Sequence, residues 1–92
     1  MIIKNFANRE FILKFRYDKK GKLITTTCIL YPKEGVMSDS NKHIASINKS
    51  FEDQHNKAIA RKYALTKLFD KYNISREDRK SFWKDYLAQV KV

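Results

Sequence analysis

The 92 residues are enough for one domain with a modest core and too few for two domains. A hydrophobic content of 42% excludes a disordered chain, and 20 Lys and Arg against 10 Asp and Glu give a formal net charge of +10. Such a charge attracts polyanions and acidic protein surfaces, and it does not determine the fold. The basic excess occurs in both halves of the chain, so we expect any anion-binding surface to belong to the folded body.

Residues 1–49 have the pattern of β-strands. Residues 1–9 predict either a short edge strand or a flap over the core. Residues 10–17 alternate between apolar and polar, which predicts a half-buried strand. Its apolar face holds Phe11, Leu13, Phe15 and Tyr17. Residues 18–21 have turn chemistry, and we expect Gly21 to take the positive φ that closes a hairpin.

The return strand covers residues 23–31, which are rich in β-branched side chains. Pro32 ends it, because proline cannot donate a hydrogen bond to a neighbouring strand. We expect Cys28, the only cysteine, to be a small buried core residue. Residues 33–41 read as a loop, and residues 43–47 either form a third short strand or remain irregular.

Residues 50–92 have helical periodicity. The main helix is predicted over residues 50–72, with Ser50 as its N-cap and Asn73 as a left-handed stop. Its main apolar face contains Phe51, Ala58, Leu65, Leu68, Phe69 and Tyr72, and a second apolar edge contains Ile59 and Tyr63. A third face carries Ala60 and Ala64 between Lys57, Lys67 and Lys71. Small residues between lysines predict that the backbone of a partner approaches this face closely.

A second helix is predicted to begin at Ser75, whose side chain caps it, with Asp78 completing a capping box. Its buried stripe is predicted to contain Phe82, Trp83, Tyr86, Leu87 and Val90. The chain therefore predicts an α+β fold in a single domain, residues 1–92. We expect an antiparallel hairpin or three-stranded sheet packed against one long helix and a second C-terminal helix.

The sequence offers little for catalysis or metal binding. The two histidines, His43 and His55, form neither a metal-ligand pair nor a partner for Cys28 as a nucleophile. Glu52, Asp53 and His55 lie at the predicted helix start, where carboxylates ordinarily offset the helix dipole. We therefore expect no enzyme, no cofactor, no metal and no small-molecule substrate.

The location of the protein follows from three absences in the sequence. No stretch approaches the ~20 apolar residues that cross a bilayer. The first residues lack the apolar core of a signal peptide, and a single cysteine fits a reducing compartment. We expect a soluble cytoplasmic protein without a membrane partner.

Basic side chains provide the candidate binding site for nucleic acid or for an acidic partner. For any single lysine, solubilising an exposed face is the simpler reading, but as a set the basic residues outnumber the neighbouring acids. No base-reading motif is present. The candidates are Lys14, Arg16, Lys19, Lys20 and Lys22 on the hairpin, Lys57, Arg61, Lys62, Lys67 and Lys71 on the main helix, and Arg79 and Lys80 on the second helix.

Arg61 is unusual because it falls within the apolar sector of the main helix. One interpretation is structural: its stem is buried and its guanidinium pairs with Asp85 or Asp70. The other is functional: an exposed guanidinium binds a phosphate or a carboxylate of a partner with two parallel hydrogen bonds. The sequence leaves both open.

The helix segment NKAIARKYALTKL (residues 56–68), followed by Arg79, Trp83 and Tyr86, resembles a group of small phage-encoded proteins. Their shared pattern is an NK–RK–AL helix and a short helix with R…W..Y, and the match covers roughly residues 24–87. This chain has Ala60 where the group most often has glycine. The resemblance implies a phage accessory protein of the host cytoplasm, a class that includes anti-defence inhibitors such as anti-CRISPRs.

The same helix also resembles the last helix of double-stranded-RNA-binding domains, although the first helix of those domains is missing here. From charge and resemblance together, we expect a non-enzymatic phage accessory protein of the anti-defence type, which binds a host nucleoprotein or its nucleic acid electrostatically. Two alternatives remain: a general module that contacts phosphate backbones, and an inhibitor that docks on an acidic host protein. Target, preference for RNA or DNA, and oligomeric state stay open.

Overall fold

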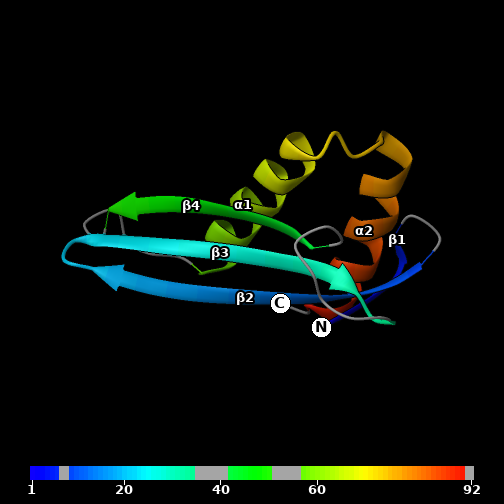
Figure 1. Ribbon diagram of the computed structural model, residues 1–92, viewed down its shortest axis with the longest axis horizontal. Coiled ribbons are helices and arrows are strands. Elements are labelled where there is room, and N and C mark those ends of the chain that lie inside the picture. The colour runs from blue at the N-terminus through cyan, green and yellow to red at the C-terminus, as the bar shows by residue number, and fades with distance from the viewer. Residues whose placement is uncertain (7–8, 35–41, 51–56, 91–92) are drawn as a thin grey trace.

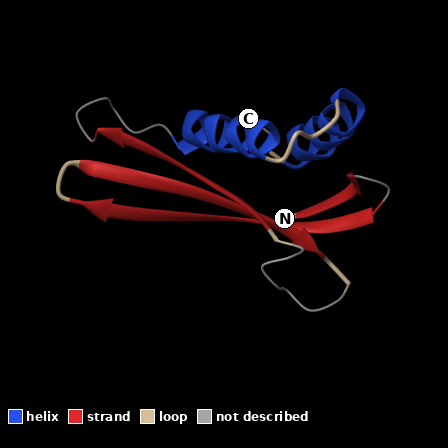
Figure 2. Ribbon diagram, turned by 45° about the horizontal axis from the view of Figure 1, so that its top comes forward, coloured by secondary structure: helices blue, strands red, loops and turns tan. Residues whose placement is uncertain are grey.

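The computed structural model describes residues 1–6, 9–34, 42–50 and 57–90 (Figure 1). Its elements are β1 (Ile2–Phe6), β2 (Arg9–Lys20), β3 (Leu23–Pro32), β4 (His43–Ser50), α1 (Lys57–Lys71) and α2 (Arg76–Gln89). The strands form one antiparallel sheet in the order β1-β2-β3-β4. Both helices cover the same face of this sheet (Figure 2). The predicted α+β class is confirmed, with four strands in place of two or three.

The β2–β3 hairpin is closed by a two-residue loop, Gly21 and Lys22. The two strands stay paired from Phe11 opposite Pro32 to Lys20 opposite Leu23. Gly21 has φ +58°, as predicted. It occupies the first of the two central positions of the turn, where the hairpin turns that match the twist of the strands need a positive φ and therefore favour glycine. The turn predicted over residues 18–21 therefore begins too early, because Asp18, Lys19 and Lys20 belong to β2 and pair with β3.

The structure resolves the two ambiguous segments of the β-rich half as edge strands. β1 has a register shift between Ile3 and Phe6, which lets both of these side chains enter the core. β4 begins at His43 and continues to Ser50, which pairs with Leu23 of β3. Ser50 is thus a strand residue, and its prediction as a helix N-cap is wrong.

The helix start was misplaced because β3 offers β4 a partner along its full length. Two cross-strand hydrogen bonds of hydroxyl groups reinforce that pairing: Thr25 donates to the amide oxygen Oδ1 of Asn48 at 2.6 Å, and Thr27 shares a hydrogen bond with the Ser46 hydroxyl at 2.8 Å. Cross-strand hydroxyl contacts of this kind stabilise sheets. The predicted positions of Phe51, Glu52, Asp53 and His55 in the helix lie outside the described residues.

The core lies between the sheet and the two helices. β2 and β3 supply alternate side chains, among them Leu13, Cys28 and Leu30, and the helices supply a continuous apolar layer above them. That layer consists of Ala64, Leu65, Leu68, Phe69, Phe82 and Tyr86. Cys28 is fully buried, as predicted, and its burial raises the pKa of the thiol to about 11, which makes it a poor nucleophile.

The orientation of the helices differs from the prediction on two points. Ala60 and Ala64 are fully buried and face the chain's own sheet, so the close partner of this lysine-flanked face is β4 and not another molecule. Alanine permits this approach because it adds almost no thickness between helix and sheet. The opposite error concerns four residues that are exposed and were expected to be buried: Ala58, Ile59, Tyr63 and Leu87.

The connection between the helices has the predicted capping signals. Asn73 has φ +52°, and Ile74 N–H donates to the Phe69 carbonyl, which is the hydrogen-bond pattern of a left-handed helix stop. Ser75 then caps α2 by accepting a hydrogen bond from Asp78 N–H at 3.2 Å. These local signals fix where α1 ends and α2 begins.

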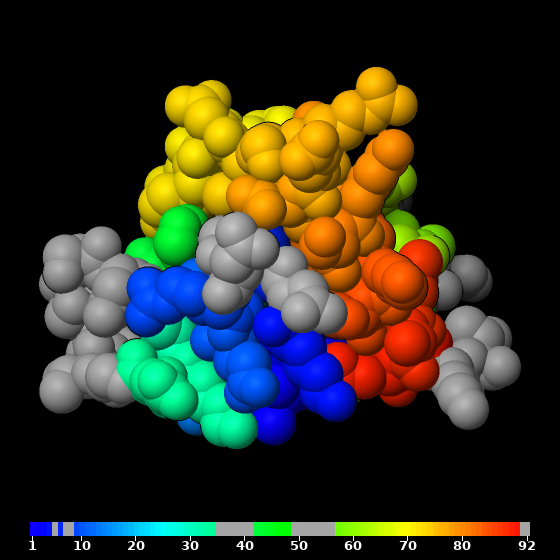
Figure 3. All heavy atoms as spheres, turned by 90° about the vertical axis from the view of Figure 1, so that its right-hand side faces the viewer, coloured from blue at the N-terminus to red at the C-terminus, as the bar shows by residue number. Residues whose placement is uncertain are grey.

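Polar side chains of the helices cover both free edges of the sheet. On β4, Lys67 Nζ donates to the Ser46 carbonyl at 2.8 Å and Lys71 Nζ donates to the Ile44 carbonyl at 3.0 Å. On β1, Lys4 N–H donates to Asp85 at 3.0 Å, and Figure 3 shows β1 and α2 side by side. Unpaired strand edges invite pairing with other chains, so these contacts keep the protein from adding strands.

The edge contacts lead to a test by substitution. Replacing Lys67 and Lys71 together by alanine uncovers the Ser46 carbonyl and leaves the Ile44 carbonyl only its 3.4 Å hydrogen bond from the Tyr72 hydroxyl. We expect concentration-dependent self-association in light scattering. The matched control replaces Lys62 and Lys80, which are exposed on the helices, and removes the same charge. Equal scattering from both double variants would show that the two ammonium groups do not protect the edge.

Candidate phosphate-binding surface at the hairpin

The face of the sheet opposite the helices is uncovered in the described structure (Figure 2). We call it the open sheet face. Because side chains alternate along a strand, residues between the core positions of β2, β3 and β4 point toward it. The register places Arg16 opposite Thr27 and Thr27 opposite Ser46, so one row of the open sheet face joins a cation to two hydroxyls.

A shallow hollow of about 460 Å³ lies at the hairpin end of the sheet. We call it the hairpin hollow. It is lined by Arg16, Asp18, Lys19, Lys20, Thr25, Thr27 and Ser46. Three cations and one carboxylate give it a net charge of +2. Its three hydroxyls are hydrogen-bonded across the strands, and Thr27 is only 2% exposed, so the cations are the groups that a phosphate can reach. Arginine and lysine are common contacts to nucleic-acid phosphates.

The carboxylate of the hairpin hollow belongs to a surface ion pair. Arg16 Nε lies 3.1 Å from Asp18 Oδ2, and both side chains are more than half exposed. An exposed pair of this kind contributes about 0–1 kcal/mol. Arg16 can therefore exchange Asp18 for a phosphate oxygen at little cost in stability.

A second group of cations lies on the helix-facing side of the same strand, where Arg61 of α1 packs on aromatic rings of β2. Arg61 Nε donates to the Tyr17 hydroxyl at 2.5 Å, and its guanidinium carbon lies 5.2 Å from the centre of the Phe15 ring. Lys57 Nζ lies 5.0 Å from the centre of the Tyr17 ring. We call Phe15, Tyr17, Lys57 and Arg61 the Arg61 cluster.

The Arg61 cluster corrects the predicted ion pair. Among the described residues, no carboxylate pairs with Arg61, and Asp85 instead accepts a hydrogen bond from the backbone of Lys4. Arg61 bonds Tyr17 instead because the side chains of β2 alternate between the two faces of the sheet, and this alternation places Tyr17 on the side that faces α1. Tyr86 of α2 adjoins the cluster: burial raises the pKa of its hydroxyl, and the nearby Arg61 charge partly opposes that rise.

The remaining predicted residues are dispersed. Lys14 lies on the open sheet face, with Nζ 5.7 Å from the centre of the Tyr31 ring, and Lys22 lies in the hairpin loop. Lys67 and Lys71 hold the β4 edge. The residues on helices that do not line the hairpin hollow or join the Arg61 cluster are Lys62, Lys67, Lys71, Arg79 and Lys80.

Sequence reasoning found the cations of the hairpin hollow and missed its hydroxyls. Thr25 and Thr27 alternate within the threonine-rich return strand, so the strand pattern was sufficient to place them on one face. Ser46 gave no such signal, because its place beside Thr27 depends on the register of β3 with β4.

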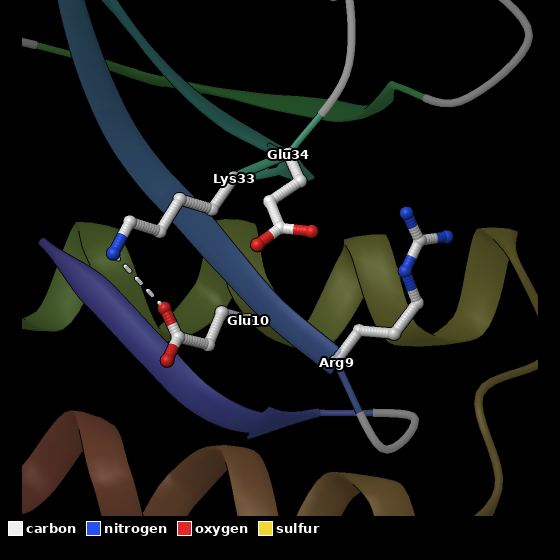
Figure 4. A pocket seen from close by; sticks show the side chains of 4 residues that line it. All are labelled: Arg9, Glu10, Lys33 and Glu34. Atoms are coloured by element: carbon white, nitrogen blue, oxygen red, sulfur yellow. Dashed lines mark ion pairs between the residues drawn. The ribbon is translucent and has the colours of Figure 1, made fainter.

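Another hollow, of about 380 Å³, lies away from the hairpin tip and has a different charge balance. Arg9, Glu10, Lys33 and Glu34 line it (Figure 4). Lys33 Nζ and Glu10 Oε2 form an ion pair at 3.1 Å, and the two cations are matched by two carboxylates. This balance gives polyanions no net attraction, so the hairpin hollow is the better candidate.

Within residues 1–6, 9–34, 42–50 and 57–90, no group of three or more histidine, cysteine or acidic side chains could hold a metal ion. Neither of the two helices described there has the length and apolar character to cross a membrane. No protein-family model, curated protein or solved structure matches this chain.

Proposed function

We propose that this chain is a non-enzymatic phage accessory protein of the anti-defence type, which binds the phosphate backbone of nucleic acid, free or within a host nucleoprotein. The observation that carries the binding proposal is the hairpin hollow. Arg16 and Lys20 lie there on a sheet face that no described helix covers, and Lys19, which alternates to the helix-facing side of β2, adds a third cation at the hairpin end. The phage and anti-defence part rests on the resemblance of residues 56–68 and of the second helix.

The chemistry of the hairpin hollow suits a phosphate backbone better than a base sequence. Phosphate contacts position a protein on nucleic acid, and specificity requires side chains that reach base edges. Thr25, Thr27 and Ser46 already bond one another or Asn48 across the strands, so few free hydrogen-bonding groups remain for reading bases. Binding of this kind depends on charge and is independent of sequence.

The principal alternative is an acidic surface on a host protein. One observation favours it: next to the cations, the open sheet face carries the partly exposed apolar residues Ile12, Ile29, Tyr31 and Ile44. Protein interfaces combine an apolar centre with a polar rim, and nucleic-acid interfaces are more polar and more positive. The two functions therefore differ in how strongly salt weakens binding.

Binding of the wild-type protein to a generic DNA duplex and to a single strand, measured by fluorescence anisotropy at several salt concentrations, tests the proposal. Three phosphate contacts predict a fall of log K with log salt concentration with a slope of about −2 to −3. Each displaced counterion contributes to that slope, whatever the sequence. Absence of binding to either nucleic acid at low salt would reject the proposal in favour of the acidic protein surface.

A further inference from the structure

Lys57 and Arg61 stand one helical turn apart on α1 and share a single aromatic ring of β2. The Lys57 ammonium lies 5.0 Å from the centre of the Tyr17 ring, and the Arg61 guanidinium carbon lies 5.8 Å from the same centre. Neither cation lines the hairpin hollow. The pair is thus a separate positive site, on the helix-facing side of β2.

The pair has no acidic partner among the described residues. Like charges four residues apart on a helix repel each other, and a carboxylate nearby would normally relieve that repulsion. The described acids of the adjoining elements are engaged elsewhere: Asp18 pairs with Arg16, and Asp85 accepts from Lys4. An anion placed between Lys57 and Arg61 would remove the repulsion.

Arg61 is also held in a fixed orientation. Its Nε is bonded to the Tyr17 hydroxyl, and its guanidinium carbon lies 5.2 Å from the centre of the Phe15 ring. Arg61 also shares a hydrogen bond with the Tyr86 side chain, and because a guanidinium has five N–H donors, terminal donors remain for a further acceptor. Because the side chain is half-buried and pre-oriented, it would lose little freedom when it binds an anion, unlike a fully exposed lysine.

We propose that Lys57 and Arg61, held on Tyr17, form a discrete phosphate site, with Arg61 supplying directed hydrogen bonds and Lys57 a point charge. The ligand is a phosphate group, either in the backbone of a nucleic acid or in a free phosphate compound. The site does not depend on the function proposed for the hairpin hollow. Two cations held over one ring carry this inference.

The chain contains five arginines, so NMR can resolve the Nε–H signal of each one and assign it by single substitutions. Inorganic phosphate and pyrophosphate would be titrated at constant ionic strength, with chloride as the compensating ion. We expect the Arg61 signal to shift and saturate. Lys57→Gln should weaken this binding about tenfold, as expected for the loss of one charge-assisted contact.

Two further variants separate binding from structure. Lys62→Gln removes a neighbouring exposed charge from α1 and should leave phosphate affinity unchanged. Arg61→Lys keeps the charge but loses the guanidinium donors, so it should weaken phosphate binding even where the folded fraction, followed by the dispersion of the NMR spectrum, stays complete. Equal effects of Lys57→Gln and Lys62→Gln, or an Arg61 signal that does not saturate, would overturn the site.

The source of the phosphate is decided with a short single-stranded oligonucleotide. If Lys57→Gln weakens binding of both pyrophosphate and the oligonucleotide, the site belongs to a nucleic-acid surface. If it weakens only pyrophosphate binding, the site serves a free phosphate compound. Both results retain the site. Neither result depends on Arg16, Lys19 or Lys20, because the salt dependence of nucleic-acid binding tests those residues in a separate experiment.

Discussion

Replacing Phe82 by alanine is expected to lower the free energy of unfolding by about 3–5 kcal/mol, the range for removal of a buried aromatic ring. Phe82 is fully buried where α2, α1 and β1 meet. Its ring centre lies 5.0 Å from that of Phe69, 5.7 Å from that of Phe6 and 6.1 Å from that of Tyr86. The substitution therefore opens a cavity in contact with three elements, which cannot all close around it.

Chemical denaturation followed by tryptophan fluorescence measures this effect, with Leu87→Ala as the matched control. Leu87 lies on the same helix and is 51% exposed, so its loss should change the free energy of unfolding by no more than about 0.5 kcal/mol. Similar losses from the two variants would mean that α2 turns a different face to the core.

The strands could be predicted from sequence because their signals are local. Alternation along residues 10–17, Gly21 at the turn and Pro32 at the strand end each act within a few residues. The extent of β4 could not be predicted in this way. Residues 48–50 have no strand signal of their own, and they are extended because β3 continues beside them to Leu23.

The end of α1 and the start of α2 were predictable, whereas the start of α1 and part of its buried face were not. Asn73 and Ser75 act through their own backbone and side-chain geometry, so their roles follow from residue type. In α1, apolar residues occur on several sides, and periodicity alone does not say which side meets the sheet. The sheet selects the alanine face of Ala60 and Ala64 and leaves Ile59 and Tyr63 largely exposed.

The charged residues of the candidate site could be predicted from the sequence, but their arrangement in space and their partners could not. Charge counts identify Arg16, Lys19 and Lys20, and the hairpin brings them together. The hydrogen-bond partner of Arg61 could not be deduced, because an arginine in an apolar sector can bond any nearby acceptor. Here the acceptor is the Tyr17 hydroxyl, which is 44 residues away in the sequence. Likewise, the hydrogen bonds of Lys67 and Lys71 to the backbone of β4 could not be predicted from the sequence.

Neutralising the hairpin hollow is expected to have the largest effect on binding. The variant with Arg16, Lys19 and Lys20 replaced by glutamine loses three cations from exposed positions, so the fold should survive. If each cation meets a phosphate, the magnitude of the salt slope falls by about three units, which removes most nucleic-acid affinity at low salt. Replacing Lys57, Lys67 and Lys71 should have a smaller effect, because two of these ammonium groups are already bonded to β4 carbonyls.

The most direct measurement compares the salt dependence of duplex binding for two triple variants with equal net charge. One carries glutamine at Arg16, Lys19 and Lys20, and the other carries glutamine at Lys62, Lys80 and Lys84, which are exposed on the helices. A slope that flattens by about three units in the first variant and stays near the wild-type value in the second is the predicted result. Equal slopes in the two variants would contradict binding at the hairpin hollow.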